Sequence, residues 1–413
     1  LFTSRESFWN PALTIGVVAL ALVVGAIPWL RGMRFTFWIF AAVAIGLVYP
    51  NFLLFLGPFD FGVFKMPAID LQNKWLMLVV VQLVMFGMGT KMSVEDFKGV
   101  AKMPYPVCIG VGLQFLIMPL IGYALANSFD LEPEIAAGII LIGSCSSGLA
   151  SNVMCFVAGA NLALSITLTS LATLLAPLAT PFWMEHLAGQ FVQINKWQMS
   201  EQIAKIVLLP IGAAMLHDYL KRSSDRSSRV TIALAQACGI GCLVGGLFAT
   251  RLVINEPLNL SPTTTEWLFL IAGAIGVALA YHYAVLILPL IERQMHLLSM
   301  AGIIFFTAVA TAAGRDNLLA CGFALILAAI LHNLAGYALG YGCSRLAGLD
   351  KTSALTVAFE VGMQNGGMAS GLAAMMGKLG TLGLASAVFS PWMNISGSIL
   401  ANLVKRHSEQ RQP

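Results

Sequence analysis

One stretch of this sequence, Glu360-Val361-Gly362-Met363-Gln364-Asn365-Gly366-Gly367, places a carboxylate and three glycines within an otherwise apolar run. The surrounding segment, 353–376, is long enough to cross a bilayer, which takes about 20 apolar residues. Glycines at this density weaken a helix and let backbone carbonyls turn outward. The stretch therefore predicts a membrane helix that is broken near its middle, beside a buried acid.

A second stretch of the same kind, Gly143-Ser144-Cys145-Ser146-Ser147-Gly148-Leu149-Ala150-Ser151-Asn152, interrupts the segment 134–157. Paired interrupted helices in corresponding halves of a chain are the sequence pattern that points to a transporter site. Gly and Ser also serve simple close packing between membrane helices, and for either stretch alone that reading stays open. The two together, one of them with an acid, favour a transport site.

Composition sets the class of protein. Of 413 residues, 58% are apolar and 10% are charged, and the mean hydropathy is +0.83. A soluble globular chain is roughly 25% charged. The apolar runs are continuous rather than alternating, which disfavours a β-barrel and predicts an all-α polytopic membrane protein. Basic residues fall in short loops and form no stripe, so we expect no nucleic-acid partner.

Charged and Pro/Gly-rich breaks divide the chain into about thirteen predicted spans. Fifteen of the 23 basic residues fall in one set of alternate loops, which predicts a cytoplasmic C-terminus, an outside N-terminus and a location in the cell inner (plasma) membrane. The first run is expected to be a retained helix rather than a signal peptide, because basic residues follow it. The spans are 11–30, 35–56, 73–90, 103–127, 134–157, 161–184, 201–220, 230–251, 265–290, 297–313, 317–345, 353–376 and 382–404.

Glu360 is the acid that lies well inside a predicted span, where a charge costs about 2.5–3.5 kcal/mol. No Lys or Arg shares the interior of that span. A protonated glutamate bonded to a neighbouring helix is one reading, and a site for a proton or a cation is the favoured one. Hard oxygen ligands at similar depth suit sodium, although a membrane Ser or Thr often bonds its own backbone instead. These side chains are Gln114, Ser151, Asn152, Ser165, Thr169 and Gln364.

Several short motifs carry a resemblance that spans most of the chain. Through them the sequence resembles the bile acid:sodium symporter family, including its bacterial members. The motifs are Met85-Phe86-Gly87-Met88-Gly89, Gln114-Phe115-Leu116-Ile117-Met118-Pro119, Ala150-Ser151-Asn152-Val153-Met154, Asn161-Leu162-Ala163-Leu164-Ser165, Leu331-His332-Asn333, Glu360-Val361-Gly362-Met363-Gln364-Asn365 and Asn394-Ile395-Ser396-Gly397-Ser398.

The resemblance implies inverted five-helix repeats with two crossing broken helices, arranged as a core domain and a panel domain. The family ordinarily has ten helices, so an N-terminal helix and a two-helix insertion are extra here. We expect an extra transmembrane helix in 1–34, the first repeat and the start of the second in 35–220, the inserted pair in 221–296, and the rest of the second repeat in 297–413.

The resemblance also implies two sodium sites that share Glu360. The first would use Ser151, Asn152, Ser165, Thr169 and Glu360, and the second Gln114, Glu360, Gln364 and the backbone carbonyls of Val361 and Met363. The substrate would meet Asn365, Gly148, Leu149, Gly366 and Met393. Two features depart from the family: Ser146, Ser147, Gly148 and Leu149 stand where relatives usually carry Pro-Gly-Gly-Thr, and Met393 stands where some bacterial relatives have His.

The function we expect is sodium-coupled symport of an organic anion, either bile-acid-like or a small carboxylate, by alternating access of core against panel. A proton-coupled carrier and a non-transporting membrane sensor remain alternatives. An enzyme is not expected, because His282 and His332 stand as separate single histidines and no metal motif occurs. Membrane lipid is the expected surrounding, and formation of a homo-oligomer is left open.

Overall fold

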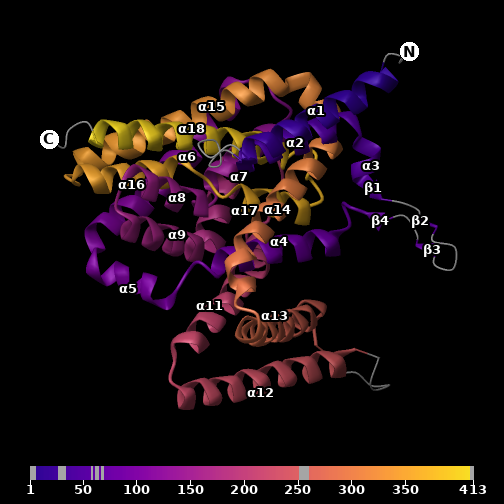
Figure 1. The fold of residues 1–413 in the computed structure, drawn as a ribbon, viewed down its shortest axis with the longest axis vertical. Helices are drawn as coiled ribbons and strands as arrows, with labels where there is room; N and C mark the ends of the chain where they lie inside the picture. The colour runs from indigo at the N-terminus through magenta and orange to yellow at the C-terminus, as the bar shows by residue number, and fades with distance from the viewer. Residues whose placement is uncertain are drawn as a thin grey trace.

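The structure is a computed structural model and describes residues 6–26, 34–56, 59–60, 65–66, 69–250 and 260–409. Nearly all of the described chain is helical (Figure 1). Its strands are two residues long and pair antiparallel: β1 (Phe55–Leu56) with β4 (Ile69–Asp70), and β2 (Phe59–Asp60) with β3 (Lys65–Met66). The predicted all-α class is confirmed.

The helices follow one another with short connections. In chain order they are α1 (Glu6–Ala26), α2 (Arg34–Val48), α3 (Pro50–Leu54), α4 (Lys74–Gly89), α5 (Val94–Lys102), α6 (Pro104–Ser128), α7 (Pro133–Ser144), α8 (Leu149–Ala158), α9 (Leu162–Trp183) with the π-helical turn η2 (Met184–Ala188), α10 (Lys196–Ile203) with the π-helical turn η3 (Ala204–Leu208), α11 (Leu209–Arg222), α12 (Asp225–Ala249), α13 (Pro262–Ile287), α14 (Leu290–Ala313), α15 (Arg315–Leu346), α16 (Lys351–Gly362), α17 (Gly366–Met375) and α18 (Leu384–Glu409).

Seven helices of the described chain are long and apolar enough to cross a membrane by themselves, and an eighth span results if α4 and α5, bent by 57°, count as one. The predicted count of thirteen stays a prediction. Two of its members, 134–157 and 353–376, are each divided into two shorter helices, α7 with α8 and α16 with α17. Division at a break is what the glycine-rich stretches predict.

The predicted span 35–56 is wrong as a single helix. Its helix α2 ends at Val48, α3 begins at Pro50, and residues 55–56 belong to β1. Proline has no backbone N–H and restricts the residue before it, and Tyr49 accordingly leaves the helical region with φ −125° and ψ 57°.

The helix that carries Glu360 is enclosed by other helices. α16 packs against α15, α6, α8 and α9, and its residues from Thr356 to Gly362 are all buried. A helix segment without an exposed side is typical of one packed among other helices inside a protein. The enclosure holds the one acidic side chain of α16 in the interior of the protein.

A second group of helices lies beside this one. α4 packs against α11, α14 and α17, and α14 packs against α2. The helices on either side of the first break, α7 and α8, pack against α9, and α8 also packs against α16. The helix after the second break, α17, packs against α4.

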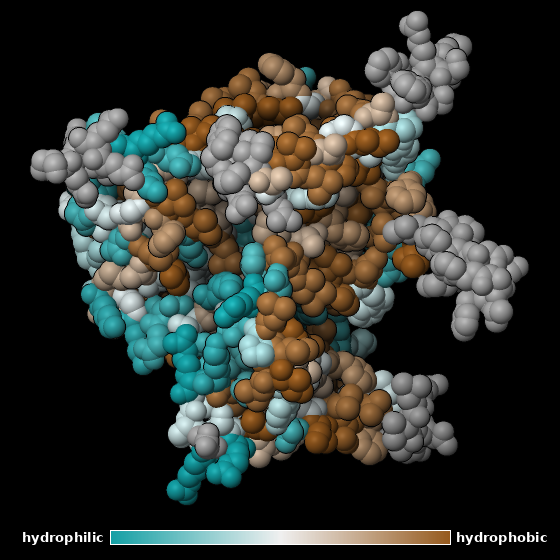
Figure 2. All heavy atoms as spheres, in the orientation of Figure 1, coloured by the Kyte–Doolittle hydropathy of each residue, from teal (hydrophilic) through white to brown (hydrophobic). Residues whose placement is uncertain are grey.

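The pair α12 and α13 projects from the rest of the molecule (Figure 1). α12 packs along α13, and α13 packs against α11. Apolar side chains of α12 such as Val230, Leu234, Ile240 and Leu243 are exposed, and brown, apolar surface continues over much of the face shown in Figure 2. In a membrane protein such surface is suited to contact lipid.

A buried lysine in η3, Lys205, joins α10 to α13. The Lys205 ammonium lies 2.8 Å from Glu201 and 2.7 Å from Glu266 of α13. The Trp267 indole N–H donates to Glu201 over 3.0 Å, and the Lys205 Nζ lies 5.4 Å from the centre of its ring. The two carboxylates are held together by the cation between them.

Replacing Lys205 with methionine is expected to lower the free energy of unfolding by about 2–3 kcal/mol. This loss lies between the losses typical of breaking an exposed and a buried ion pair. The Lys205 side chain is 9% exposed, but its two partners are about one third exposed. Lys205→Arg keeps the charge and is expected to retain most of the stability. Thermal unfolding in detergent measures the difference, and equal melting temperatures for Lys205→Met and wild type would contradict the role of this contact.

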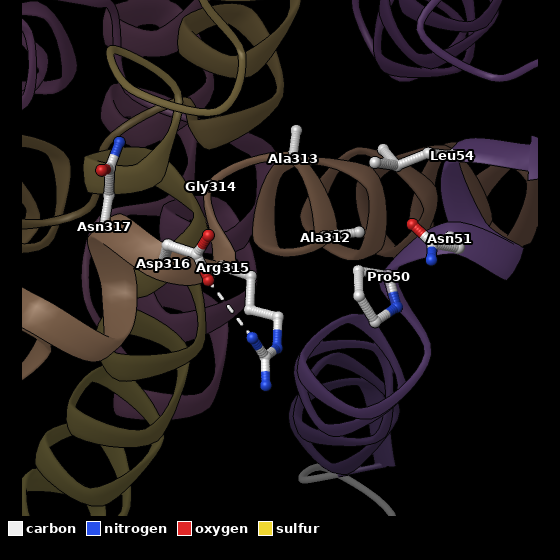
Figure 3. Close-up of a pocket in the computed structure, with 9 residues that line it drawn as sticks. All are labelled: Pro50, Asn51, Leu54, Ala312, Ala313, Gly314, Arg315, Asp316 and Asn317. Atoms are coloured by element: carbon white, nitrogen blue, oxygen red, sulfur yellow. Dashed lines mark hydrogen bonds and ion pairs between the residues drawn. The ribbon is translucent and has the colours of Figure 1, made fainter. Parts of the chain in front are cut away.

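A pocket of about 360 Å³ lies where α14 meets α15, against α3 (Figure 3). The Arg315 Nε donates to the Leu47 carbonyl over 2.8 Å, and its Nη1 lies 3.2 Å from Asp316 Oδ1. None of the residues predicted to bind sodium or substrate lines this pocket.

Candidate functional site

The two glycine-rich breaks contact each other in the structure. Ser147 in the first break and Gln364 in the second form an isolated antiparallel bridge. The Asn365 backbone N–H donates to the Ser146 carbonyl over 2.8 Å. The two breaks are therefore joined by main-chain contact between segments more than 200 residues apart.

Local backbone geometry opens each break. Cys145, after α7, and Gly148, before α8, are extended at φ −76°, ψ 164° and φ −113°, ψ 169°. Met363 leaves α16 at φ −109° and ψ 106°. A side chain at position 148 would put a Cβ 3.3 Å from the Gln364 carbonyl oxygen, tighter than most contacts, so glycine lets the two segments approach.

Glu360 lies at the centre of the first predicted sodium site and is 1% exposed. Its Oε1 accepts hydrogen bonds from the hydroxyls of Ser151 (2.7 Å) and Ser165 (2.5 Å). Its Oε2 accepts from Ser147 (2.5 Å) and Thr169 (2.8 Å). Among the described residues, no ion pair joins a basic side chain to this carboxylate.

Oxygen acceptors exceed hydroxyl hydrogens around Glu360. The Ser165 hydroxyl lies 2.7 Å from Asn152 Oδ1 as well as near Glu360, and the Thr169 hydroxyl lies 3.1 Å from the same amide oxygen. The Ser151 hydroxyl is also 2.7 Å from the Gly148 carbonyl. Each hydroxyl carries one hydrogen, so it can serve only one of these acceptors at a time. A bound cation would satisfy the surplus oxygens, and hard oxygen ligands are those that sodium prefers.

The residues predicted for the second sodium site also lie together. Gln114 Nε2 donates to Gln364 Oε1 (3.0 Å) and to the Cys145 carbonyl (3.1 Å). Gln364 Nε2 donates to the Val361 carbonyl over 2.6 Å. Gln114 Oε1 is buried and has no hydrogen-bond partner among the described atoms. Met363 is fully buried at the end of α16, within the same break.

A narrow void lies beside Glu360. It has no room for a water molecule and is lined by Gly110, Val111, Gln114, Ser147, Leu168, Ala172 and Glu360. Glu360, predicted for both sites, and Gln114, predicted for the second, therefore border the same space.

The residues predicted to meet the substrate gather at the starts of α8 and α17, with one exception. Gly148 and Asn365 are the caps of these helices, and the Asn365 Oδ1 accepts from the Met368 N–H over 3.0 Å. Leu149 and Gly366 are the first residues of the two helices. Met393 lies on α18, where its carbonyl is 3.4 Å from the Tyr337 hydroxyl.

The helix α4 covers the amide of Asn365. The Asn365 Nδ2 lies 3.6 Å from the Met88 sulfur. A Cβ on Gly366 would come within 2.0 Å of the Ser390 hydroxyl, so α18 closes the other side. The start of α17 is enclosed, whereas Leu149 at the start of α8 is partly exposed.

Two features escaped the sequence reasoning. Ser147 was not among the predicted ligands, although its stretch had been singled out and its hydroxyl contacts Glu360. His282 was expected to stand alone, but its Nδ1 lies 3.3 Å from Nδ1 of His217, a residue on α11. That expectation is wrong, because the packing of α13 on α11 joins residues 65 positions apart. His332 does stand apart from them, with Nε2 2.9 Å from the Met118 carbonyl.

Comparison with known proteins agrees with the motifs. Residues 78–256 match the model of the Sodium Bile acid symporter family. An uncharacterized sodium-dependent transporter, YocS of Bacillus subtilis (strain 168), is 30% identical over 391 residues, which cover 94% of this chain and 96% of that protein.

More distant relatives carry related names. The probable sodium/metabolite cotransporter BASS1, chloroplastic, of Arabidopsis thaliana is 25% identical over 91% of this chain and 74% of its own length. The ileal sodium/bile acid cotransporter of Homo sapiens is 27% identical over 70% of this chain and 66% of its own length. These relatives are named as transporters and not as enzymes. A 30% identical relative is covered almost end to end, and the resemblance is thereby confirmed: the chain belongs to the sodium bile acid symporter family of multi-pass membrane transporters.

Proposed function

We propose that this protein is a secondary active symporter that couples sodium to the movement of an organic anion across the membrane. One observation carries the proposal: the Glu360 carboxylate is buried among hydroxyl and amide oxygens, with no basic side chain paired to it in the described chain. Burying such a charge is costly, and a bound cation removes most of the cost.

We assign two sodium ions to the site. The first is held by Ser151, Asn152, Ser165, Thr169 and Glu360. The second is held by Gln114, Gln364, Glu360 and the carbonyls of Val361 and Met363. The surplus of acceptors in the first set and the unpartnered Gln114 Oε1 in the second support this assignment.

Charge balance gives a reason for coupling. One carboxylate and two sodium ions leave a net charge of +1, and a monocarboxylate substrate brings the occupied site to neutrality. A neutral assembly costs much less to expose at mid-membrane than a charged one. We place the substrate at the starts of α8 and α17, near Gly148, Leu149, Asn365 and Gly366, because helix N-termini favour negative charge.

The apolar side chains Leu149 and Met393 bear on the substrate class. Leu149 begins α8, and Met393 is 6% exposed on α18. These side chains favour an anion with a substantial apolar part over a small polyhydroxylated acid. The human relative is named for bile acids, which have this amphipathic character.

For movement, we propose that α6–α9 and α15–α18 form the core and that α2, α4, α10–α11 and α14 form the panel. The core then rocks against the panel and opens the starts of α8 and α17 to alternate sides. Contacts of α4 with α17, including Met88 with Asn365, lie on that boundary. We place α12 and α13 with the panel, since α13 packs on α11, and we place the C-terminus in the cytoplasm of a cell with the protein in its plasma membrane.

Uptake into proteoliposomes tests the coupling. A panel of radiolabelled carboxylates and sulfonates is first screened by thermal shift in sodium chloride. Uptake of the stabilising anion is expected to require an inward sodium gradient and to stop when potassium replaces sodium at the same ionic strength. Equal uptake in both salts would rule out sodium coupling. Uptake that follows a pH gradient at fixed sodium would identify a proton-coupled carrier instead.

A further inference from the structure

A hydroxyl outside both assigned ligand sets lies at the junction of the two sodium positions. Ser147 is 1% exposed, and its Oγ donates to Glu360 Oε2 over 2.5 Å. Its Oγ is also 3.4 Å from the Thr169 hydroxyl of the first position. Its main chain pairs with Gln364 of the second position. The crossing of the two breaks therefore fixes where this hydroxyl points.

Gln114, which lines the void beside Ser147, has an amide oxygen without a hydrogen-bond partner among the described atoms. Gln114 is 2% exposed, and its Nε2 is committed to Cys145 and Gln364. That commitment fixes the amide orientation and leaves Oε1 as the free end, without a partner in the described part of the protein. A buried acceptor without a partner costs about 1–3 kcal/mol, so a ligand that supplies positive charge is favoured there.

The chemistry of the void suits one kind of ion. The single hydrogen of Ser147 goes to Glu360, so the lone pairs of its oxygen stay available. Ser147 Oγ, Glu360 Oε2 and Gln114 Oε1 are hard oxygen donors with one negative charge among them. A monovalent cation is favoured over a divalent one, because Glu360 supplies a single negative charge for both proposed ion positions and a divalent ion at one of them would enlarge the positive excess. Because the void has no room for water, an ion bound there has lost its hydration shell, and the smaller sodium ion needs less widening of the void than potassium.

We propose that Ser147 is a sodium ligand that joins the two cation positions. Its oxygen contacts the ion held by Gln114 and Glu360, and its hydrogen bond to Glu360 Oε2 connects that ion to the one held by Thr169 and its neighbours. The inference rests on the proposed function. It adds that occupancy of one position favours the other through Ser147, and that Ser147 contributes to selection against potassium.

The test uses the full chain in detergent and follows the unfolding temperature during titration with sodium, lithium or potassium chloride, with choline chloride holding the ionic strength constant. Wild type is expected to respond to sodium with a Hill slope above one. Ser147→Ala is expected to raise the sodium concentration at the titration midpoint on the order of ten-fold and to bring the Hill slope to one. It is also expected to narrow the difference between the sodium and potassium midpoints.

Ser146→Ala is the matched control, because this neighbour lies in the same break and its hydroxyl contacts Thr173 and Met368 rather than Glu360. It is expected to titrate as wild type. Ser147→Cys keeps the size of the side chain but replaces the hard oxygen with sulfur, and it is expected to behave like Ser147→Ala. It decides the question if the alanine variant does not fold.

The outcomes separate the two proposals. A purely structural role for Ser147 changes the unfolding temperature without salt but leaves the sodium midpoint, the Hill slope and the ratio of sodium to potassium midpoints unchanged, and that result would overturn the inference. Sodium titrations of Ser147→Ala and Ser147→Cys that match wild type would overturn it as well. A wild-type protein that does not respond to sodium would instead refute the proposed function itself.

Discussion

Glu360→Gln is expected to remove the sodium response of the protein while leaving it at least as stable as wild type in sodium-free buffer. Glutamine keeps the shape of the side chain and can still bond the surrounding hydroxyls of Ser147, Ser151, Ser165 and Thr169. It lacks the charge that attracts a cation. A buried carboxylate without a counter-ion destabilises the fold. Replacing it with a neutral amide therefore stabilises the protein when sodium is absent.

The size of the effect follows from binding linkage. A ligand at 100 times its dissociation constant stabilises the folded state by about 2.7 kcal/mol, and both assigned positions lose their shared anion in this variant. Uptake of the transported anion is expected to fall by at least about 100-fold. Unfolding temperatures with and without sodium, measured beside proteoliposome uptake, provide the check.

Glu185→Gln is the matched control, since Glu185 is a partly exposed acid that pairs with Lys196 away from the crossing. It is expected to keep the full sodium response. A Glu360→Gln protein that is stabilised by sodium as much as wild type would remove the basis of both assigned ion positions. A variant that is unstable in every salt would indicate a structural carboxylate instead.

Gly362→Ala is expected to give the second largest effect, a loss of about 1–3 kcal/mol in the free energy of unfolding, together with loss of uptake. A Cβ at this position would lie 2.2 Å from Cδ1 and 2.4 Å from Cε1 of the Tyr337 ring. The ring has little freedom to withdraw, because its hydroxyl lies 3.3 Å from that of Ser396. Asn333 donates to the Gly362 carbonyl over 2.8 Å, so the backbone is held as well.

The control for this substitution lies on the helix that carries Tyr337. Gly342 of α15 has no atom within 4 Å of an added Cβ, so Gly342→Ala is expected to be neutral or slightly stabilising. Tyr337→Leu combined with Gly362→Ala is expected to recover part of the loss, because the clash involves both residues. Thermal unfolding of the single and double variants measures the coupling. Additive losses would show that the ring is not what excludes the methyl group.

Much of the candidate site was accessible from sequence. An acid within an apolar span has to be protonated or paired with a cation. This requirement identifies Glu360 from the sequence alone. The glycines and serines near it and near Ser151 predicted two breaks, because these residue types weaken a membrane helix wherever it packs. Burial, residue chemistry and local backbone preference are properties of short segments, so the sequence reports them directly.

Other contacts depend on how distant helices meet. Ser147 reaches Glu360 across 213 positions only because the two breaks cross at Ser147 and Gln364. His217 meets His282, and Lys205 meets Glu266, only because α13 packs against the helices before it. No local pattern encodes the angle and register at which two helices pack, so the sequence left these residues as isolated polar groups.

What the sequence determined and what the tertiary structure decided therefore differ for a physical reason. The sequence alone determined a membrane protein of apolar helices, two weakened spans and a buried acid in need of a positive partner. The tertiary structure decided which oxygens surround that acid, that the span ending near residue 56 breaks at Pro50, and that the additional hydroxyl of Ser147 contacts the acid. These outcomes arise from packing between elements far apart in the chain, where each contact is set by the whole arrangement of helices.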